Sequence, residues 1–139
     1  LQYTKSGVGP VAIVGRGEAA VGLVFSHDCV AGRLQGLPLK VTFPSEGTGY
    51  EIGGVALIKG AKNPEAAKSY IDFALSREAQ NLGPTVASFQ VLTNPKTKVD
   101  PRMVKLSSVS IVNYDFEKAA AAKKALTAKF DATIAIAPK

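Results

Sequence analysis

The sequence predicts an α/β protein with a largely parallel sheet, and three observations support that class. Two short apolar runs, residues 19–25 and 52–58, have the continuous hydrophobic character of strands buried on both faces. Segments with helical spacing alternate with these runs. A long helical segment then runs from Asp115 to about Ala132. Alternation of strand and helix is typical of parallel sheets that are covered by helices.

In the first third of the chain, each expected element is bounded by turn or cap residues. Ser26 or Asp28 can cap a helix that follows the first apolar run, and Gly36 and Pro38 end that helix. The elements expected here are, in order, a short helix over residues 11–18, a strand over 19–25, a helix from Ser26 to about Leu34, a strand over 39–43 and a loop over 44–50.

The remaining two thirds contain the clearest helix signals. Asn63, Pro64 and Glu65 combine an N-cap residue, a proline at the first helical position and an acid in the first turn. The elements expected here are a strand over residues 52–58, a helix from Pro64, a turn capped by Ser76 that ends at Gly83 and Pro84, an irregular stretch over 85–112 with a strand-like part at 88–92, and a long helix from Asp115.

Composition excludes several classes of protein. The chain has 139 residues, of which 46% are hydrophobic and 20% charged, so it is too apolar to be disordered. Its one cysteine, Cys29, excludes a fold built on disulfides. No apolar run approaches the 18 residues that a membrane-spanning helix requires.

The net charge of +6 comes from 17 basic and 11 acidic side chains. The densest basic cluster lies in the last helical segment, where the spacing places it mainly on a solvated face; it comprises Lys118, Lys123, Lys124 and Lys129. Interleaved aromatic residues and a nucleic-acid motif are both missing from this cluster, so we expect no nucleic-acid partner. A mildly positive field would instead help to gather a small anionic ligand.

Ser26, His27 and Asp28 directly follow the first predicted strand. In open α/β sheets, ligands bind beyond the carboxyl ends of the strands, so these side chains are candidates for ligand contact. Helix capping is the simpler alternative. A hydrolase that uses Ser26, His27 or Cys29 is a weaker one, because adjacent side chains point in different directions. His27 is the only histidine, and a zinc site is therefore not expected.

Two glycine-containing loops are further candidates. Gly47 lets backbone N–H groups approach a ligand closely, while Thr48 and Tyr50 offer hydroxyl groups. A purely structural turn explains this loop equally well. Ser6 and Gly7 precede a possible helix N-terminus, which is a position that favours anions.

Four motifs give the chain a resemblance to a known family. They are GEAAVGL at residues 17–23, EGTGYEI at 46–52, VALIKGAKNPEAAK at 55–68 and IDFALSREAQ at 71–80. Together they resemble the type 2 periplasmic solute-binding proteins of ABC importers, in the branch that binds ferric iron, phosphonates or sugar phosphates.

This resemblance implies two α/β lobes that hold a ligand between them. It assigns residues 1–46 to the second lobe, 47–51 to a crossing and hinge between lobes, and 52–139 to the return strand and closing helices of the first lobe. Family members are about twice as long, so we expect the partner of this chain to include a missing N-terminal half of the same protein.

The resemblance also implies the function. We expect capture of a small phosphorylated, phosphonate or carboxylate compound and its delivery to a permease in the inner membrane. The protein would then be periplasmic, or tethered outside the membrane in a Gram-positive host, and would be neither an enzyme nor a cofactor-binding protein. The ligand contacts expected are Ser6, Gly7, Ser26, His27, Asp28, Gly47, Thr48 and Tyr50.

Two other functions stay open at this point. Ferric-binding relatives use paired tyrosines in the loop that corresponds to residues 26–28, where this chain has none, because its four tyrosines are scattered at positions 3, 50, 70 and 114. Ferric binding is therefore the alternative rather than the first expectation. The effector-binding domain of a LysR-type regulator shares the fold, but the chain contains no helix-turn-helix.

Overall fold

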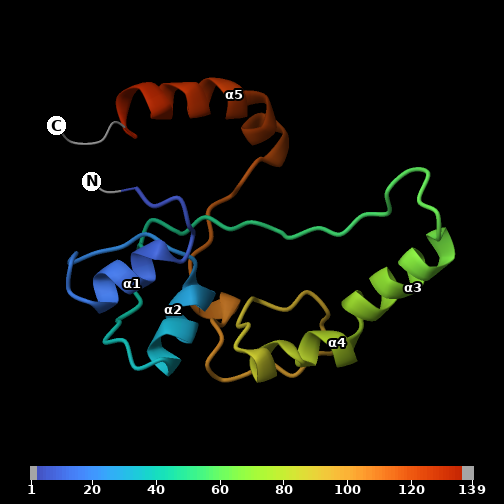
Figure 1. Ribbon diagram of the computed structural model, residues 1–139. Helices are drawn as coiled ribbons and strands as arrows, with labels where there is room; N and C mark the ends of the chain where they lie inside the picture. Colours follow the sequence, from blue (N-terminus) through green and yellow to red (C-terminus); the bar gives the residue numbers. More distant parts are fainter. Residues whose placement is uncertain (1–2, 136–139) are drawn as a thin grey trace.

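The computed structural model describes residues 3–135 of the chain, and within them the regular structure is helical (Figure 1). The elements are α1 (Gly9–Gly15), α2 (Ser26–Leu34), α3 (Pro64–Leu75), α4 (Arg77–Asn81), η1 (Gly83–Val86), η2 (Leu106–Ser108) and α5 (Phe116–Thr133).

Helices α1 and α2 pack against each other through a glycine. A Cβ atom at Gly32 would lie 2.6 Å from Val11 Cγ1 and 3.0 Å from Leu39 Cδ1, so only glycine allows this close approach. Val11 is consequently one of the few buried apolar side chains in the described part of the chain. Gly36 ends α2 as predicted, because its φ of +86° is a conformation that glycine adopts at little cost.

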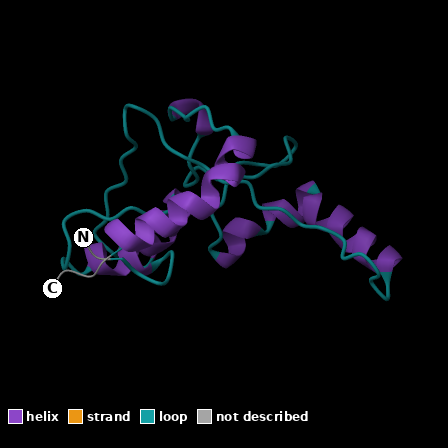
Figure 2. Ribbon diagram, turned by 90° about the horizontal axis from the view of Figure 1, so that it is seen from above, coloured by secondary structure: helices purple, strands orange, loops and turns teal. Residues whose placement is uncertain are grey.

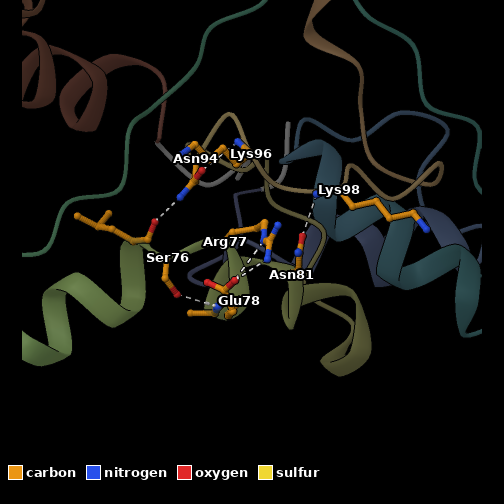
Figure 3. Close-up of polar contacts among 9 residues, drawn as sticks. Ser76, Arg77, Glu78, Asn81, Asn94, Lys96 and Lys98 are labelled. Carbon is orange, nitrogen blue, oxygen red and sulfur yellow. Dashed lines mark hydrogen bonds and ion pairs between the residues drawn. The ribbon is translucent and has the colours of Figure 1, made fainter.

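Helices α3 and α4 follow one another and are separated by Ser76. The Ser76 hydroxyl accepts a hydrogen bond of 3.1 Å from the Ala79 N–H, which confirms the predicted cap (Figure 3). Asn63 occupies the N-cap position of α3, as predicted, but its side chain makes no capping hydrogen bond. The proline at the first position of α3 therefore contributes more to its start than the Asn63 side chain does.

The loop after η1 is fastened to α4 by side-chain amides. The Gln80 Oε1 atom accepts hydrogen bonds from the Thr93 and Asn94 N–H groups at 3.1 and 2.9 Å, and Asn81 Oδ1 accepts one from the Lys98 N–H at 2.9 Å. Figure 3 shows the Asn81 contact beside that from Asn94 to the end of α3. These hydrogen bonds hold the irregular loop against α4.

The long helix α5 begins at the predicted residue. The Asp115 carboxylate accepts a hydrogen bond of 3.0 Å from the Lys118 N–H and so caps the helix. Near the other end, the Phe130 ring meets Tyr3 edge-to-face at a centroid distance of 5.1 Å. The rest of α5 is largely exposed, and none of its residues is buried.

The predicted strands do not form a sheet within residues 3–135. The stretches 19–25, 39–43, 52–58 and 88–92 are all outside regular structure, and Figure 2 accordingly shows helices and loops without strands. A strand is stable only when neighbouring strands satisfy its N–H and C=O groups. The described residues supply one such contact, an isolated parallel bridge between Thr48 and Ile111.

Few apolar side chains are buried. In the described residues the buried hydrophobic side chains are Val11, Phe89 and Met103. Phe89 is covered on one face by the Arg102 guanidinium, whose central carbon lies 4.8 Å from the ring centroid. In both views of the molecule, α3 projects away from the α1–α2 pair, with a long extended segment leading to it (Figures 1 and 2).

Candidate functional site

Three candidate ligand contacts lie together in the first turn of α2. Phe25 is the N-cap residue of this helix, so Ser26 is its first residue and, against the prediction, makes no capping hydrogen bond. Ser26, His27 and Asp28 are all half-buried. The His27 Nε2 atom lies 3.5 Å from Asp28 Oδ1, and the imidazole stacks on Phe25 at a centroid distance of 5.4 Å.

This turn combines donors with an acceptor. The N–H groups at the start of an α-helix have no partner within the helix and favour an anion. In α2 the Asp28 N–H is already taken, because it donates to the Phe25 carbonyl at 3.1 Å. The Ser26 hydroxyl and the imidazole add side-chain donors, and the Asp28 carboxylate can accept hydrogen bonds from hydroxyl groups.

The same turn lacks the features of a nucleophilic site. Burial, and secondarily the charge of Asp28, raise the pKa of the Cys29 thiol above its ordinary value, so the reactive thiolate is disfavoured. Among the side-chain hydrogen bonds of residues 3–135, none joins Ser26 to His27, the contact that would activate a serine.

The loop of Ser6 and Gly7 lies before α1 and is exposed. The Ser6 carbonyl accepts hydrogen bonds from the Thr4 hydroxyl at 2.6 Å and from the Gly9 N–H at 3.1 Å, which shapes the turn. Space around Gly7 is open, because a Cβ atom there would meet nothing within 4 Å. The turn is thus accessible, and the seven-residue helix α1 after it is short.

Gly47 and Thr48 lie beside a second segment from the far end of the chain. The Thr48 N–H donates to the Ser110 carbonyl at 2.9 Å, and the Val112 N–H donates to the Thr48 carbonyl at 3.1 Å. Gly47 has φ +114°, and a Cβ atom on it would lie 3.1 Å from Val112 Cγ1. These two neighbouring segments, residues 47–50 and 110–114, are called the paired crossing below, after the interlobe crossing that the resemblance predicts at residues 47–51.

Tyr50 belongs to an aromatic cluster at the end of the paired crossing. Its ring centroid lies 6.2 Å from that of Tyr114 and 5.8 Å from that of Phe116, and these two are 5.0 Å apart. All three pairs have edge-to-face geometry, which is favourable for aromatic rings. The cluster connects the crossing to the start of α5.

Sequence reasoning did not find the second half of the paired crossing. It left residues 85–112 irregular, although the adjacent apolar pair Ile111 and Val112 and the alternation of Tyr114 with Phe116 were available signals. Conversely, no hydrogen bond or ion pair among the described residues links the α2 turn with the Ser6 loop or the paired crossing. The candidate residues thus form three groups that no polar contact between described residues joins.

The described residues contain no group of three or more His, Cys, Asp and Glu side chains placed to hold a metal ion. In the same part of the chain, none of the helices has both the length and the apolar character needed to cross a membrane.

Comparison with known proteins identifies the family. Residues 2–81, more than half of the chain, match the family described as bacterial extracellular solute-binding protein. The chain belongs to this family. The resemblance seen in the motifs at residues 17–80 is therefore confirmed at the level of the solute-binding family, whose description is one of binding rather than catalysis.

Two relatives illustrate the relationship. The chain is similar to an uncharacterized protein of Haemophilus influenzae, with 44% identity over 132 residues that cover 93% of this chain and 38% of the relative. It is also similar to the periplasmic binding protein AfuA from Actinobacillus pleuropneumoniae, whose structure was solved with exogenous fructose-6-phosphate bound. That match has a TM-score of 0.88 and 42% identity and covers 98% of this chain and 44% of AfuA.

These matches show that the chain has the conformation of part of a periplasmic binding protein. It spans less than half of the length of each of these two relatives.

Proposed function

We propose that this chain is part of the substrate-binding component of an ABC importer and that it binds a small anionic solute of the sugar-phosphate class. One observation carries the proposal. Almost the whole chain, 98%, superimposes with a TM-score of 0.88 and 42% identity on a binding protein that holds fructose-6-phosphate. At that identity the local geometry of a binding loop is usually retained along with the fold.

The chemistry of the α2 turn supports the same class of ligand. Free N–H groups at the start of α2 suit a phosphate, and the half-buried position of Ser26 and His27 limits competition from water. Asp28 would repel a phosphate placed directly against it, but its carboxylate suits a hydroxyl group. A ligand that carries both an anionic group and several hydroxyl groups suits the N–H donors of the turn as well as the Asp28 carboxylate.

The remaining candidate residues would complete the site from the border of a cleft between two α/β lobes of the type 2 fold. In this proposal, residues 1–46 belong to the second lobe, 47–51 to the crossing and 52–139 to the first lobe. Ser6 and Gly7 border the cleft from one side, and Gly47, Thr48 and Tyr50 border it from the crossing. Only two backbone hydrogen bonds between described residues join Thr48 to the 110–112 segment, which supports a role of this region as hinge, because a hinge is made of a few loop residues that can change their backbone angles.

The proposed partner is an ABC permease, and the proposed location is the periplasm or the outer surface of the cytoplasmic membrane. Family membership supports both, because the family is described as extracellular and solute-binding. Closure of the lobes around the solute would be the signal that the permease recognises.

Calorimetric titration of the purified protein that contains this chain tests the proposal. Fructose-6-phosphate should bind, whereas fructose and inorganic phosphate should each bind far more weakly. Replacing Asp28 with Asn should lower the affinity for the sugar phosphate by about tenfold to a hundredfold, since hydrogen bonds to charged groups contribute about 1.5–3 kcal/mol. Asp72→Asn, at an exposed position on α3, is the matched control and should leave the affinity unchanged.

Two results would contradict the proposal. Equal affinity for inorganic phosphate and fructose-6-phosphate would show that the sugar hydroxyl groups, and hence their proposed hydrogen bonds to Asp28, contribute nothing to binding. A visible charge-transfer band after exposure to ferric citrate would instead favour the ferric alternative, because tyrosinate coordination of iron is coloured.

A further inference from the structure

His27 has two neighbours that attract a positive charge. Its Nε2 atom lies 3.5 Å from the Asp28 Oδ1 atom, and its ring stacks on the Phe25 ring with an interplanar angle of 13°. A carboxylate attracts a protonated imidazole as an ion pair, and an aromatic face within about 6 Å attracts a cation. The side chains of His27 and Asp28 are only 26% and 17% exposed, so salt and water screen these attractions incompletely. His27 is therefore placed where a positive charge can be accommodated.

The described surroundings of the α2 turn supply no second cation. The segment that leads into α2, residues 19–25, is uncharged, and helix α1, which packs against α2, has no ionisable side chain. On α2 itself, burial raises the pKa of the Cys29 thiol, which therefore stays neutral. Arg33 lies in the last turn, about 9 Å further along the helix. Among the ion pairs of residues 3–135, the one that involves Asp28 is formed with His27.

A sugar phosphate would bring more negative charge to this turn than the backbone can offset. A phosphate monoester carries a charge of about −2 near neutral pH, because its second ionisation lies near pH 6. The N-terminus of a helix offers the equivalent of only about half a positive charge. Asp28 adds a negative charge that is half-buried. A proton on His27 supplies one full positive charge beside Asp28, and the pair as a whole then no longer repels the phosphate.

We propose that His27 is the charge-selecting residue of the α2 turn. It binds the ligand as the imidazolium ion, and on binding a proton from solvent adds to the ring nitrogen that carries none in the neutral form. The site consequently prefers a doubly charged phosphate monoester to a singly charged anion of the same shape. The inference rests on the proposed function, because it takes the α2 turn to lie against the phosphate compound.

The proposal predicts a pH dependence of definite sign. An ordinary histidine side chain titrates near about pH 6.5, so above that pH binding must first protonate the imidazole. The affinity of the purified protein that contains this chain for fructose-6-phosphate should therefore fall as the pH rises, by up to about tenfold per pH unit. Below about pH 6 the affinity should also fall, because the ligand becomes a monoanion. In His27→Gln only this second fall should remain.

Calorimetry measures the proton directly. Fructose-6-phosphate is titrated at about pH 7.5 in two buffers of different ionisation enthalpy, and the difference between the apparent binding enthalpies gives the number of protons taken up. The unchanged protein should take up at least about half a proton per ligand, and His27→Gln should take up none. Asp72→Asn, at an exposed position on α3, is the matched control and should take up the same amount as the unchanged protein.

A singly charged analogue tests the charge selection. Fructose 6-sulfate has nearly the shape of fructose-6-phosphate but carries one negative charge. The unchanged protein should bind the phosphate at least about tenfold more tightly than the sulfate, and this preference should disappear in His27→Gln. His27→Lys, which carries a fixed positive charge, should keep the preference and take up no proton. This variant separates the loss of the charge from the loss of the ring.

Three results would overturn the inference while the proposed function stands. They are binding of fructose-6-phosphate without proton uptake, uptake that persists in His27→Gln, and a preference for the phosphate that is as weak in His27→Lys as in His27→Gln. The second would place the proton on the ligand or on another group, and the third would show that the ring matters rather than its charge. Failure of fructose-6-phosphate to bind at any pH would contradict the proposed function and, with it, the role of His27.

Discussion

Replacement of Gly47 with alanine should open the bridge that joins the two halves of the paired crossing. Gly47 has φ +114°, a conformation that residues with a side chain rarely adopt. The added Cβ atom would also lie 3.1 Å from Val112 Cγ1 and 3.4 Å from the Val112 nitrogen. Relief of either contact moves Val112 away from Thr48.

The expected magnitude follows from two opposing terms. A residue held in such a sparsely populated conformation costs about 1–3 kcal/mol. The bridge consists of two backbone hydrogen bonds, at 2.9 and 3.1 Å, each of which contributes about 0.5–1.5 kcal/mol. Because the strain is about as large as the total of about 1–3 kcal/mol that the two bonds of the bridge contribute, Gly47→Ala should leave the bridge open for much of the time.

Amide hydrogen exchange at Thr48 and Val112 measures this opening. A cost of about 2 kcal/mol corresponds to exchange that is about thirty times faster in Gly47→Ala. Gly49→Ala is the matched control, because a Cβ atom at Gly49 meets nothing within 4 Å and its φ is not positive. Equal exchange rates at Thr48 in the two variants would refute the reasoning.

Three further predictions concern the helices and their loops. Gln80→Ala should speed amide exchange at Thr93, since three hydrogen bonds are lost that together contribute about 1.5–4.5 kcal/mol. Gln80→Glu, which keeps the accepting oxygens, should have a milder effect, and equal effects of the two variants would contradict this. The side chain and then the N–H of Arg102 lower the pKa of Asp100 to about 2. The stabilisation from this pair should therefore be complete above pH 3.8 and disappear as the pH falls through about 2, and an NMR titration midpoint near 3.8 would disprove it. Asp115→Ala should destabilise α5 by about 1 kcal/mol and reduce helicity by circular dichroism; Asp131→Ala, near the other end, should not.

The helices were the part of the fold that could be predicted best, because their signals are local. Ser76 and Asp115 each hydrogen-bond an N–H three residues later, and Pro64 begins α3 at the expected position. Such contacts involve one turn of chain and are independent of the rest of the molecule. The exceptions were Ser26 and Asn63. Both lie at the start of a helix, but neither side chain makes a capping hydrogen bond.

The candidate site could be predicted only in part. The placement of Ser26, His27 and Asp28 in one helical turn follows from their adjacency, whereas their half-buried environment is seen only in the structure. The partners of Thr48 could not be found in this way, because Ser110 and Val112 are more than sixty residues away along the chain. Contacts at that separation depend on how the whole chain is arranged in space.

The apolar runs show the same difference between properties that nearby residues determine and properties that depend on distant segments. Residues 52–58 have the composition of a buried strand, and the sequence is sufficient to indicate that character. Composition does not supply the neighbouring strands, and within residues 3–135 the run remains extended, exposed and unpaired. A helix satisfies its backbone groups from within, whereas a strand must take its hydrogen bonds from another segment, so the helices were determined by the sequence nearby and the sheet depends on tertiary contacts.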